Sequence, residues 1–304
     1  MSEARLSPRS PAAQYTPEAV TACEKALRTL LGRIGPWGGR MVLVGGLVPR
    51  YLVSAAIETV GPHIGTTDLD VVLGVALATD EEEVYRTLQR NLVEARFHPG
   101  RDEDTGQELS YRWQRDDVDG VRVVLEFFCP VGDGEPGRLR RNPTEAAGSR
   151  ISAIRLTGAE LAAQDHTVVP LPGEVLDEGG TRDDVHLRVA GVLPFVVLKA
   201  IALAEREKDK DAYDLVWTLS AFGGGPAGVV AAAARSPVLH SPLVPVALAK
   251  LREHFAGIER VGPSRYARFF LGVTDDDDVR DRLRRDAHAV LQLFLHEWEI
   301  AGLP

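Results

Sequence analysis

Two aspartates, two residues apart, interrupt an apolar stretch in the N-terminal half of the chain. Asp68 and Asp70 stand in TTDLDVVLGVAL at 66–77, and the apolar character of this segment predicts a buried strand. Side chains at positions i and i+2 of a strand point to the same face, so the two carboxylates should lie side by side. Two such carboxylates repel each other unless they share a proton or a cation. Mg²⁺ or Mn²⁺ is the cation that suits hard oxygen ligands, and an acidic strand end in solvent is the alternative.

The segments on either side of the aspartates predict a mixed α/β domain. MVLVGG at 41–46 indicates a strand that ends in a glycine pair, residues 47–60 indicate a packed helix, and VRVVLEFFCP at 121–130 indicates a third central strand. Strands that alternate with helices in this way are typical of an α/β mixed sheet.

The length of 304 residues allows two domains. We expect a disordered N-terminal arm at 1–15, the mixed-sheet domain at 16–190 and a helical domain at 191–304, where the sequence becomes rich in Ala, Leu and Arg. A helix is predicted over 193–206, and 213–222 continues or follows it.

Composition argues against several classes of protein. Two cysteines, Cys23 and Cys129, are too few for a disulfide framework or a four-cysteine zinc site. No apolar run reaches the roughly 20 residues of a membrane span, and the first residues lack the apolar core of a secretory signal. We therefore expect a cytoplasmic protein without membrane contact. The net charge of −9 argues against a protein that coats nucleic acid by charge alone, but it allows one basic groove.

Two further features add to the aspartate pair. Glu126 is the one charged residue in the apolar run 123–129. An ion pair with a buried arginine would explain this charge, but a metal cluster shared with the two aspartates explains it better. Gly45 and Gly46 let backbone amides approach a phosphate closely in front of a helix N-terminus, although a glycine pair also makes a tight turn.

A second group of charged residues follows in KAIALAEREKDKDAYDL at 199–215. Lys199 stands between VVL and AIALA, so its stem should be packed and its charge should have a partner. On one helix, Arg206 would lie on the same face about 10 Å away, and the two cations could reach different parts of a polyphosphate. A snorkelling lysine and a solvated face of alternating charges are the alternatives.

In combination, VLVGG, TTDLDVVL, the acid in VVLEFF and the pattern K-x6-R-x-K-x-K-D-x-Y-D-L resemble the nucleotidyltransferase superfamily. More narrowly, they resemble the AbiEii/AbiGii and MenT-type toxins of type IV toxin–antitoxin and phage-defence systems. The resemblance covers about 40–215. It implies a minimal nucleotidyltransferase (DNA polymerase β-like) mixed-sheet domain followed by a helical C-terminal domain.

The resemblance also gives each motif residue a role. It implies that Asp68, Asp70 and Glu126 are ligands of Mg²⁺ or Mn²⁺. It also implies that the catalytic residues are Asp68, Asp70, Glu126, Lys199 and Asp211. As nucleotide-binding residues it implies Gly45, Gly46, Thr67, Lys199, Arg206 and Lys208.

The activity implied is transfer of a nucleoside monophosphate from a nucleoside triphosphate to an acceptor hydroxyl. By analogy with the toxins, the expected acceptor is the 3′ end of tRNA, and a cognate antitoxin is an expected partner. Support from the residues themselves is limited to two basic groups. Arg138, Arg140 and Arg141 follow the third strand, and the helical region has Lys250, Arg252, Arg260, Arg265 and Arg268 with Tyr266 and Phe269 among them as stacking groups.

Two alternatives to a tRNA-modifying toxin remain open. One is the same chemistry on a small molecule, such as an aminoglycoside, or on a protein hydroxyl. The acidic net charge suits a cationic small acceptor. The other is a non-catalytic regulator that binds a nucleotide, against which the intact set of buried charges argues.

Overall fold

The structure is a computed structural model of the chain. It describes residues 11–53, 61–66, 68–73, 82–102, 104–116, 120–141, 151–176, 180–272 and 276–304.

The chain divides into two compact units. One, here called the sheet unit, comprises Pro17–Leu47 and Gly65–Ala190, and the other, here called the helical unit, comprises Met1–Thr16, Val48–Ile64 and Gly191–Pro304. The predicted division after residue 190 is one boundary between the units. The segment Val48–Ile64 belongs to the helical unit, whereas the sequence analysis placed it with the mixed-sheet domain.

The sheet unit is built around a nine-stranded sheet in the order β3-β4-β5-β2-β1-β11-β8, with β7 paired to β5 and β6. Its strands are β1 (Met41–Val44), β2 (Asp68–Leu73), β3 (His98–Arg101), β4 (Glu108–Asp116), β5 (Arg122–Pro130), β6 (Leu139–Arg141), β7 (Ser152–Leu156), β8 (His166–Pro170) and β11 (His186–Ala190). A separate pair is formed by β9 (Gly173–Glu174) and β10 (Thr181–Arg182). Because β2 runs antiparallel to β1 and parallel to β5, the sheet is mixed. The predicted α/β class with a mixed sheet is confirmed.

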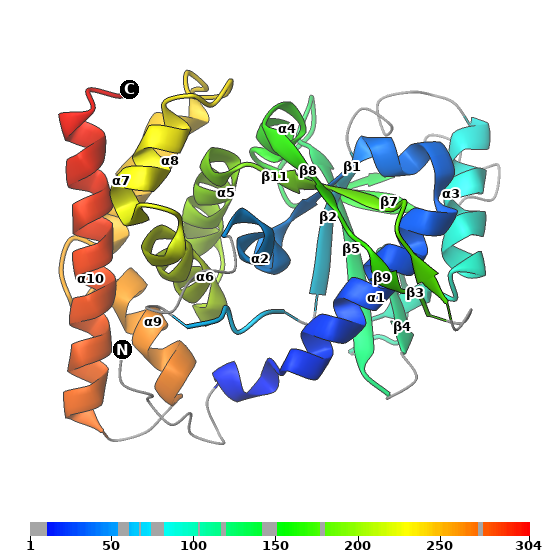
Figure 1. The fold of residues 1–304 in the computed structure, drawn as a ribbon, viewed down its shortest axis with the longest axis horizontal. Coiled ribbons are helices and arrows are strands. Elements are labelled where there is room, and N and C mark those ends of the chain that lie inside the picture. Colours follow the sequence, from blue (N-terminus) through cyan, green and yellow to red (C-terminus); the bar gives the residue numbers. More distant parts are fainter. Residues whose placement is uncertain are drawn as a thin grey trace. The chain divides into compact units, whose positions relative to one another are not determined.

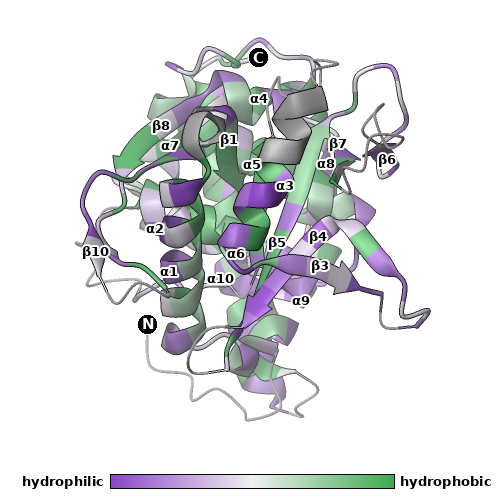
Figure 2. Ribbon diagram, turned by 90° about the vertical axis from the view of Figure 1, so that its right-hand side faces the viewer, coloured by the Kyte–Doolittle hydropathy of each residue, from purple (hydrophilic) through white to green (hydrophobic). Residues whose placement is uncertain are grey.

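Alternation along β5 separates an apolar face of the sheet from a polar one. Leu125 and Phe127 are fully buried, and their partners Leu69 and Val71 on β2 are buried as well. The helices α1 (Pro17–Arg33) and α4 (Ala159–Gln164) contact both strands, and α1 also contacts α3 (Glu82–Glu94). Short 3-10 helices, Gly35–Arg40 and Gly45–Leu47, precede and follow β1. In Figure 2, hydrophilic colours run along β3 and β4.

The helical unit is a cluster of helices (Figure 1). It contains a 3-10 helix (Pro11–Gln14), α2 (Val48–Leu52), α5 (Val192–Glu205), α6 (Asp209–Ala221), α7 (Gly225–Ala233), α8 (Leu243–His254), α9 (Val261–Leu271) and α10 (Asp277–Ile300). Helix α5 contacts α6, α7 and α8, and the long helix α10 lies against α9 and α7. A helix that is apolar on nearly all sides, as α5 is, needs this kind of cover.

The charged segment 199–215 is not one continuous helix. Helix α5 ends at Glu205, Arg206 has an extended backbone, and α6 begins at Asp209. Lys199 and Arg206 therefore do not share a helix face as expected from the sequence. The polar run EREKDKD between the two apolar segments is where the helix ends.

The described part of the predicted N-terminal arm has regular structure. Residues 11–14 form a 3-10 helix, and Ala12 is buried. The ring of Tyr15 lies 5.8 Å from that of Phe269, centroid to centroid. These contacts attach the segment to α9.

Within the described part of the chain, no single helix is long and apolar enough to cross a membrane. One bent pair, α6 with α7, passes the same test of length and composition with an angle of 93° between its two helices.

Candidate functional site

A row of charged residues crosses three neighbouring strands of the sheet unit. Asp70 on β2 is in register with Glu126 on β5, and Glu126 is in register with Arg112 on β4. Residues paired in this way project from the same face of a sheet. Asp68, two residues before Asp70, shares that face. The strand order thus brings the three carboxylates predicted from the sequence to one face.

Gly45 lies directly against the carboxylate of Asp70. Its φ of +76° falls in the left-handed region, which favours glycine. A Cβ at Gly45 would overlap the carboxylate and lie 2.6 Å from Cγ of Asp70. Any larger residue would therefore displace Asp70 or the backbone. The neighbouring Gly46 is buried, and the nucleotide-binding role of both glycines stays a prediction.

Glu126 forms a close ion pair with Arg112. Nε of Arg112 donates a hydrogen bond to Oε1 of Glu126 at 2.7 Å, and Nη2 lies 2.5 Å from the same oxygen. The side chain of Glu126 is 16% exposed and that of Arg112 is 40% exposed. Partial burial lowers the pKa of Arg112, but the charge and hydrogen bond of Glu126 outweigh burial and raise it. The ion pair considered from the sequence is therefore present, with an arginine that remains partly exposed.

The carboxylates of Asp68, Asp70 and Glu126 are suitable ligands for a divalent metal, but their present positions do not form a metal site. Carboxylate oxygens on one face suit Mg²⁺ or Mn²⁺, and the glycine at position 45 leaves room for Asp70. Among the residues that the structure describes, however, no group of three or more His, Cys, Asp or Glu side chains is arranged to hold a metal ion. Glu126 faces Arg112 instead. The metal-binding role of Asp68, Asp70 and Glu126 stays a prediction.

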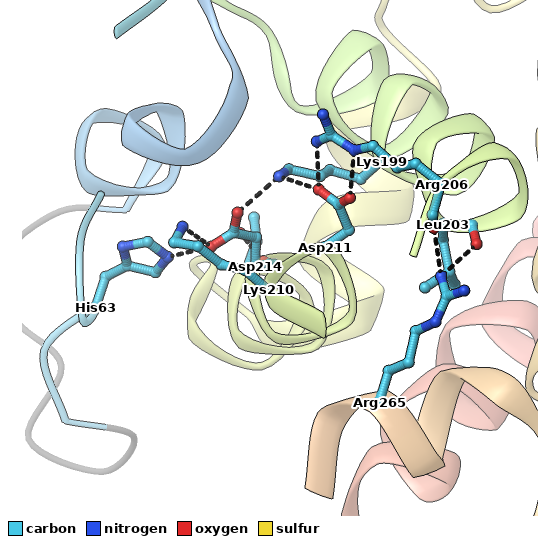
Figure 3. A network of polar contacts seen from close by, with 9 residues as sticks. His63, Lys199, Leu203, Arg206, Lys210, Asp211, Asp214 and Arg265 are labelled. Atoms are coloured by element: carbon cyan, nitrogen blue, oxygen red, sulfur yellow. Dashed lines mark hydrogen bonds and ion pairs between the residues drawn. The ribbon is translucent and has the colours of Figure 1, made fainter. Parts of the chain in front are cut away.

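The second predicted group of residues lies in the helical unit, where Lys199 is buried between two aspartates (Figure 3). Its Nζ donates to Oδ1 of Asp211 at 2.8 Å and to Oδ2 of Asp214 at 2.6 Å. Arg206 donates from Nε and Nη2 to the two carboxylate oxygens of Asp211 at 2.7 and 2.9 Å. Lys199, Arg206 and Asp211 therefore belong to one network, although Arg206 lies beyond the end of the helix that contains Lys199.

Asp214 is a centre of this network that the sequence analysis missed. It accepts a hydrogen bond from Lys210 at 2.6 Å, and its Oδ1 lies 2.9 Å from Nε2 of His63. Burial raises the pKa of Asp214, but Lys199 and Lys210 outweigh burial and hold it well below its ordinary value. Burial lowers the pKa of His63 to about 4, so His63 is neutral near pH 7. The spacing of Lys210 and Asp214, four residues apart on one helix, was the available signal.

The partner that Lys199 was expected to need is thus supplied within the helical unit. Burial lowers the pKa of Lys199, but Asp211 and Asp214 outweigh burial and raise it, so the ammonium stays charged. Burial raises the pKa of Asp211, but Lys199 and Arg206 lower it to about 2. The predicted roles of these residues toward a triphosphate stay predictions. Lys208 is the residue before α6.

The predicted basic surface with stacking aromatics is not realised as expected. Tyr266 and Phe269 are buried, so their rings are unavailable to stack on bases. Arg265 donates at 2.7 Å to each of two carbonyls, those of Leu203 and Arg206, and Arg268 forms two hydrogen bonds with Asp209. The reason is that α9 turns its aromatic face into the core of the helical unit.

The remaining predicted residues are less informative. Thr67 lies outside the described residues, as does the side chain of Arg141. Arg138 is exposed, and Arg140 is on β6 and partly buried.

In comparisons with known proteins, no protein-family model and no curated protein matches the chain. The resemblance to nucleotidyltransferases therefore stands on the quoted motifs alone.

Proposed function

We propose that this protein is a metal-dependent nucleotidyltransferase that moves a nucleoside monophosphate from a nucleoside triphosphate to an acceptor hydroxyl. The observation that supports the proposal is the charged row of the sheet unit. Asp68 and Asp70 share one face of β2, and Asp70 is in register with Glu126 on the adjacent parallel strand. Gly45 keeps the space beside Asp70 clear of a side chain. In this proposal the sheet unit is the minimal nucleotidyltransferase domain.

The reaction is an in-line attack on the α-phosphate. A new oxygen–phosphorus bond forms from the acceptor hydroxyl, the bond between the α-phosphorus and the bridging oxygen breaks, and pyrophosphate leaves. Asp68 and Asp70 would hold Mg²⁺ or Mn²⁺, which when bound supplies positive charge to the attacking and leaving oxygens. Glu126 would complete the ligand set or accept the proton of the attacking hydroxyl.

Within this proposal, the acceptor is the 3′ end of tRNA in the cytoplasm, and the protein is a toxin with a cognate antitoxin. The motif resemblance supports this choice. A cationic small molecule such as an aminoglycoside is the second candidate acceptor. The net charge of −9 favours it, as do the ion pair of Arg268 and the backbone contacts of Arg265.

The test is a transfer assay with the purified protein, Mg²⁺, total bacterial RNA and each α-³²P-labelled nucleoside triphosphate in turn. Label in the tRNA band is expected, and Asp70→Asn should abolish it. Asp116→Asn is the matched control, because Asp116 on β4 forms an exposed ion pair with Arg122 outside the charged row. This control should keep full activity.

The other outcomes separate the alternatives. Label on an aminoglycoside or on protein, again lost in Asp70→Asn, would move the proposal to that acceptor. If folded protein transfers no label to any of these acceptors, or if Asp70→Asn transfers as well as the parent, the proposed function is wrong.

A further inference from the structure

We infer that Arg112 is a stand-in cation for the metal: it holds Glu126 in the ligand-free protein and competes with the divalent ion for that carboxylate. This inference rests on the proposed function, because it concerns the same metal site. It gives a positioning role to a residue that no motif of the sequence singled out.

The first argument is the geometry of the ion pair. Both close contacts of Arg112 go to one oxygen of Glu126, Oε1: Nε donates a hydrogen bond to it at 2.7 Å, and Nη2 forms an ion-pair contact with it at 2.5 Å. Asp70 faces Glu126 from the other side in the register of the sheet. Arg112 and a metal bound beside Asp70 would therefore draw the Glu126 carboxylate in opposite directions, so a metal that binds this carboxylate must pull it away from Arg112.

The second argument is that the aliphatic stem of Arg112 packs against the backbone of β3. A Cβ at Gly100 on β3 would lie 3.1 Å from Cγ and 3.2 Å from Cδ of Arg112. The β3–β4 register also shifts between Pro99 and Gly100, as at a β-bulge. The stem thus packs over backbone where a side chain would crowd it. The guanidinium, at the partly exposed end, can change partner without unpacking that stem.

The third argument concerns charge. Two or three carboxylates on one face repel each other, and the cost is reduced when a cation lies among them. Glu126 contacts Arg112 directly, and Asp68 and Asp70 lie on the same face of the sheet. Arg112 thus supplies part of the positive charge that a metal would bring. Metal binding must then displace Arg112 from Glu126.

The experiment is calorimetric titration of the ligand-free protein with Mn²⁺ alone. Arg112→Met should bind Mn²⁺ about tenfold more tightly than the parent, the order expected when a charge-assisted hydrogen bond no longer competes. Arg122→Met is the matched control, since it removes the same charge from the exposed end of β5, next to Asp116. Its Mn²⁺ affinity should stay within about twofold of the parent, because exposed charges at a distance are screened.

A double-mutant cycle assigns the effect to Glu126. In a Glu126→Gln background, Arg112→Met should no longer change the Mn²⁺ affinity. Thermal unfolding checks that each variant is folded. If Arg112→Met does not fold, Arg112→Lys serves in its place, since lysine keeps the charge but lacks the guanidinium fork, and a smaller gain in affinity is expected.

The failures of the two proposals are distinguishable. If the parent binds Mn²⁺ and the folded Arg112 variant binds it no more tightly, the inference about Arg112 is wrong and the metal site stands. A gain that persists with Glu126→Gln, or that Arg122→Met reproduces, also refutes the inference. If neither the parent nor the Arg112 variant binds Mn²⁺, both the inference and the metal-dependent function are wrong.

Discussion

Replacement of Asp214 by asparagine tests the buried ion network of the helical unit. Asp214 is fully buried on α6 and contacts Lys199, Lys210 and His63. Asparagine has nearly the same shape but no charge. The substitution therefore removes the electrostatic part of these contacts and little of the packing.

The loss of stability caused by Asp214→Asn depends on which buried charges lose their partner. Lys199 keeps its contact with Asp211, but Lys210 is itself buried and forms its ion pair with Asp214. Removing one partner of a buried pair costs about 3–5 kcal/mol, because the other charge stays buried without compensation. Burial already lowers the pKa of Lys210, so the loss of Asp214 should lower it further.

Asp209→Asn is the matched control. It makes the same chemical change on the same helix, at a pair with Arg268 whose side chains are 15% and 53% exposed. Because Arg268 is half exposed, it stays hydrated when Asp209 loses its charge, so this substitution should cost less than removal of the fully buried Asp214. Amide hydrogen exchange across 209–221 measures the free energy of opening of α6 in each variant. If Asp214→Asn and Asp209→Asn lower this free energy by equal amounts, the buried-charge argument is wrong.

Two further predictions concern single side chains. Burial lowers the pKa of His63 from 6.5 to about 4, so the unfolded state binds more protons in this window. The free energy of unfolding should fall by about 3 kcal/mol as the pH drops from 6.5 to 4, and urea titrations of His63→Gln should show a flatter dependence. Gly45→Ala should abolish Mn²⁺ binding and nucleotidyl transfer, because its Cβ would overlap Asp70. Gly61→Ala has the same φ of +76° but nothing within 4 Å, so its effect on both assays should be absent despite a strain of about 1–3 kcal/mol.

The central strands and the shared face of the aspartates were predictable because they depend on local patterns. The apolar run around Asp68 and Asp70 gave β2, and the two-residue period of a strand gave the common face. The partner of Glu126 was not predictable in this way. It depends on which strand lies next to β5 and in what register, and Arg112 is assigned only by that long-range pairing. The run SYRWQR at 110–115 contains Arg112, but nothing in this run indicates that Glu126 is its partner.

The helical unit shows the same division between local and long-range information. The sequence predicted that Lys199 needs a partner, and the structure shows Asp211, twelve residues along the chain, as one of two. Asp214 and His63 are 151 residues apart, so no local pattern connects them. The end of α5 at Glu205 has a local signal, because a polar run separates the two apolar segments, and the helix predicted over 193–206 ends one residue later.

The two sets of predicted site residues differ in how readily a ligand could engage them. Lys199 is buried against two carboxylates, so using its charge for a ligand means opening contacts of the kind that cost about 3–5 kcal/mol to break. The pair of Arg112 and Glu126 is only partly buried, and exchanging Arg112 for a divalent cation leaves Glu126 paired and releases a guanidinium that is already 40% exposed to water. The binding free energy of a ligand is the difference between the free energy of the contacts that it forms and that of the contacts that it breaks. The charged row of the sheet unit should therefore respond to a divalent cation before the Lys199 network does.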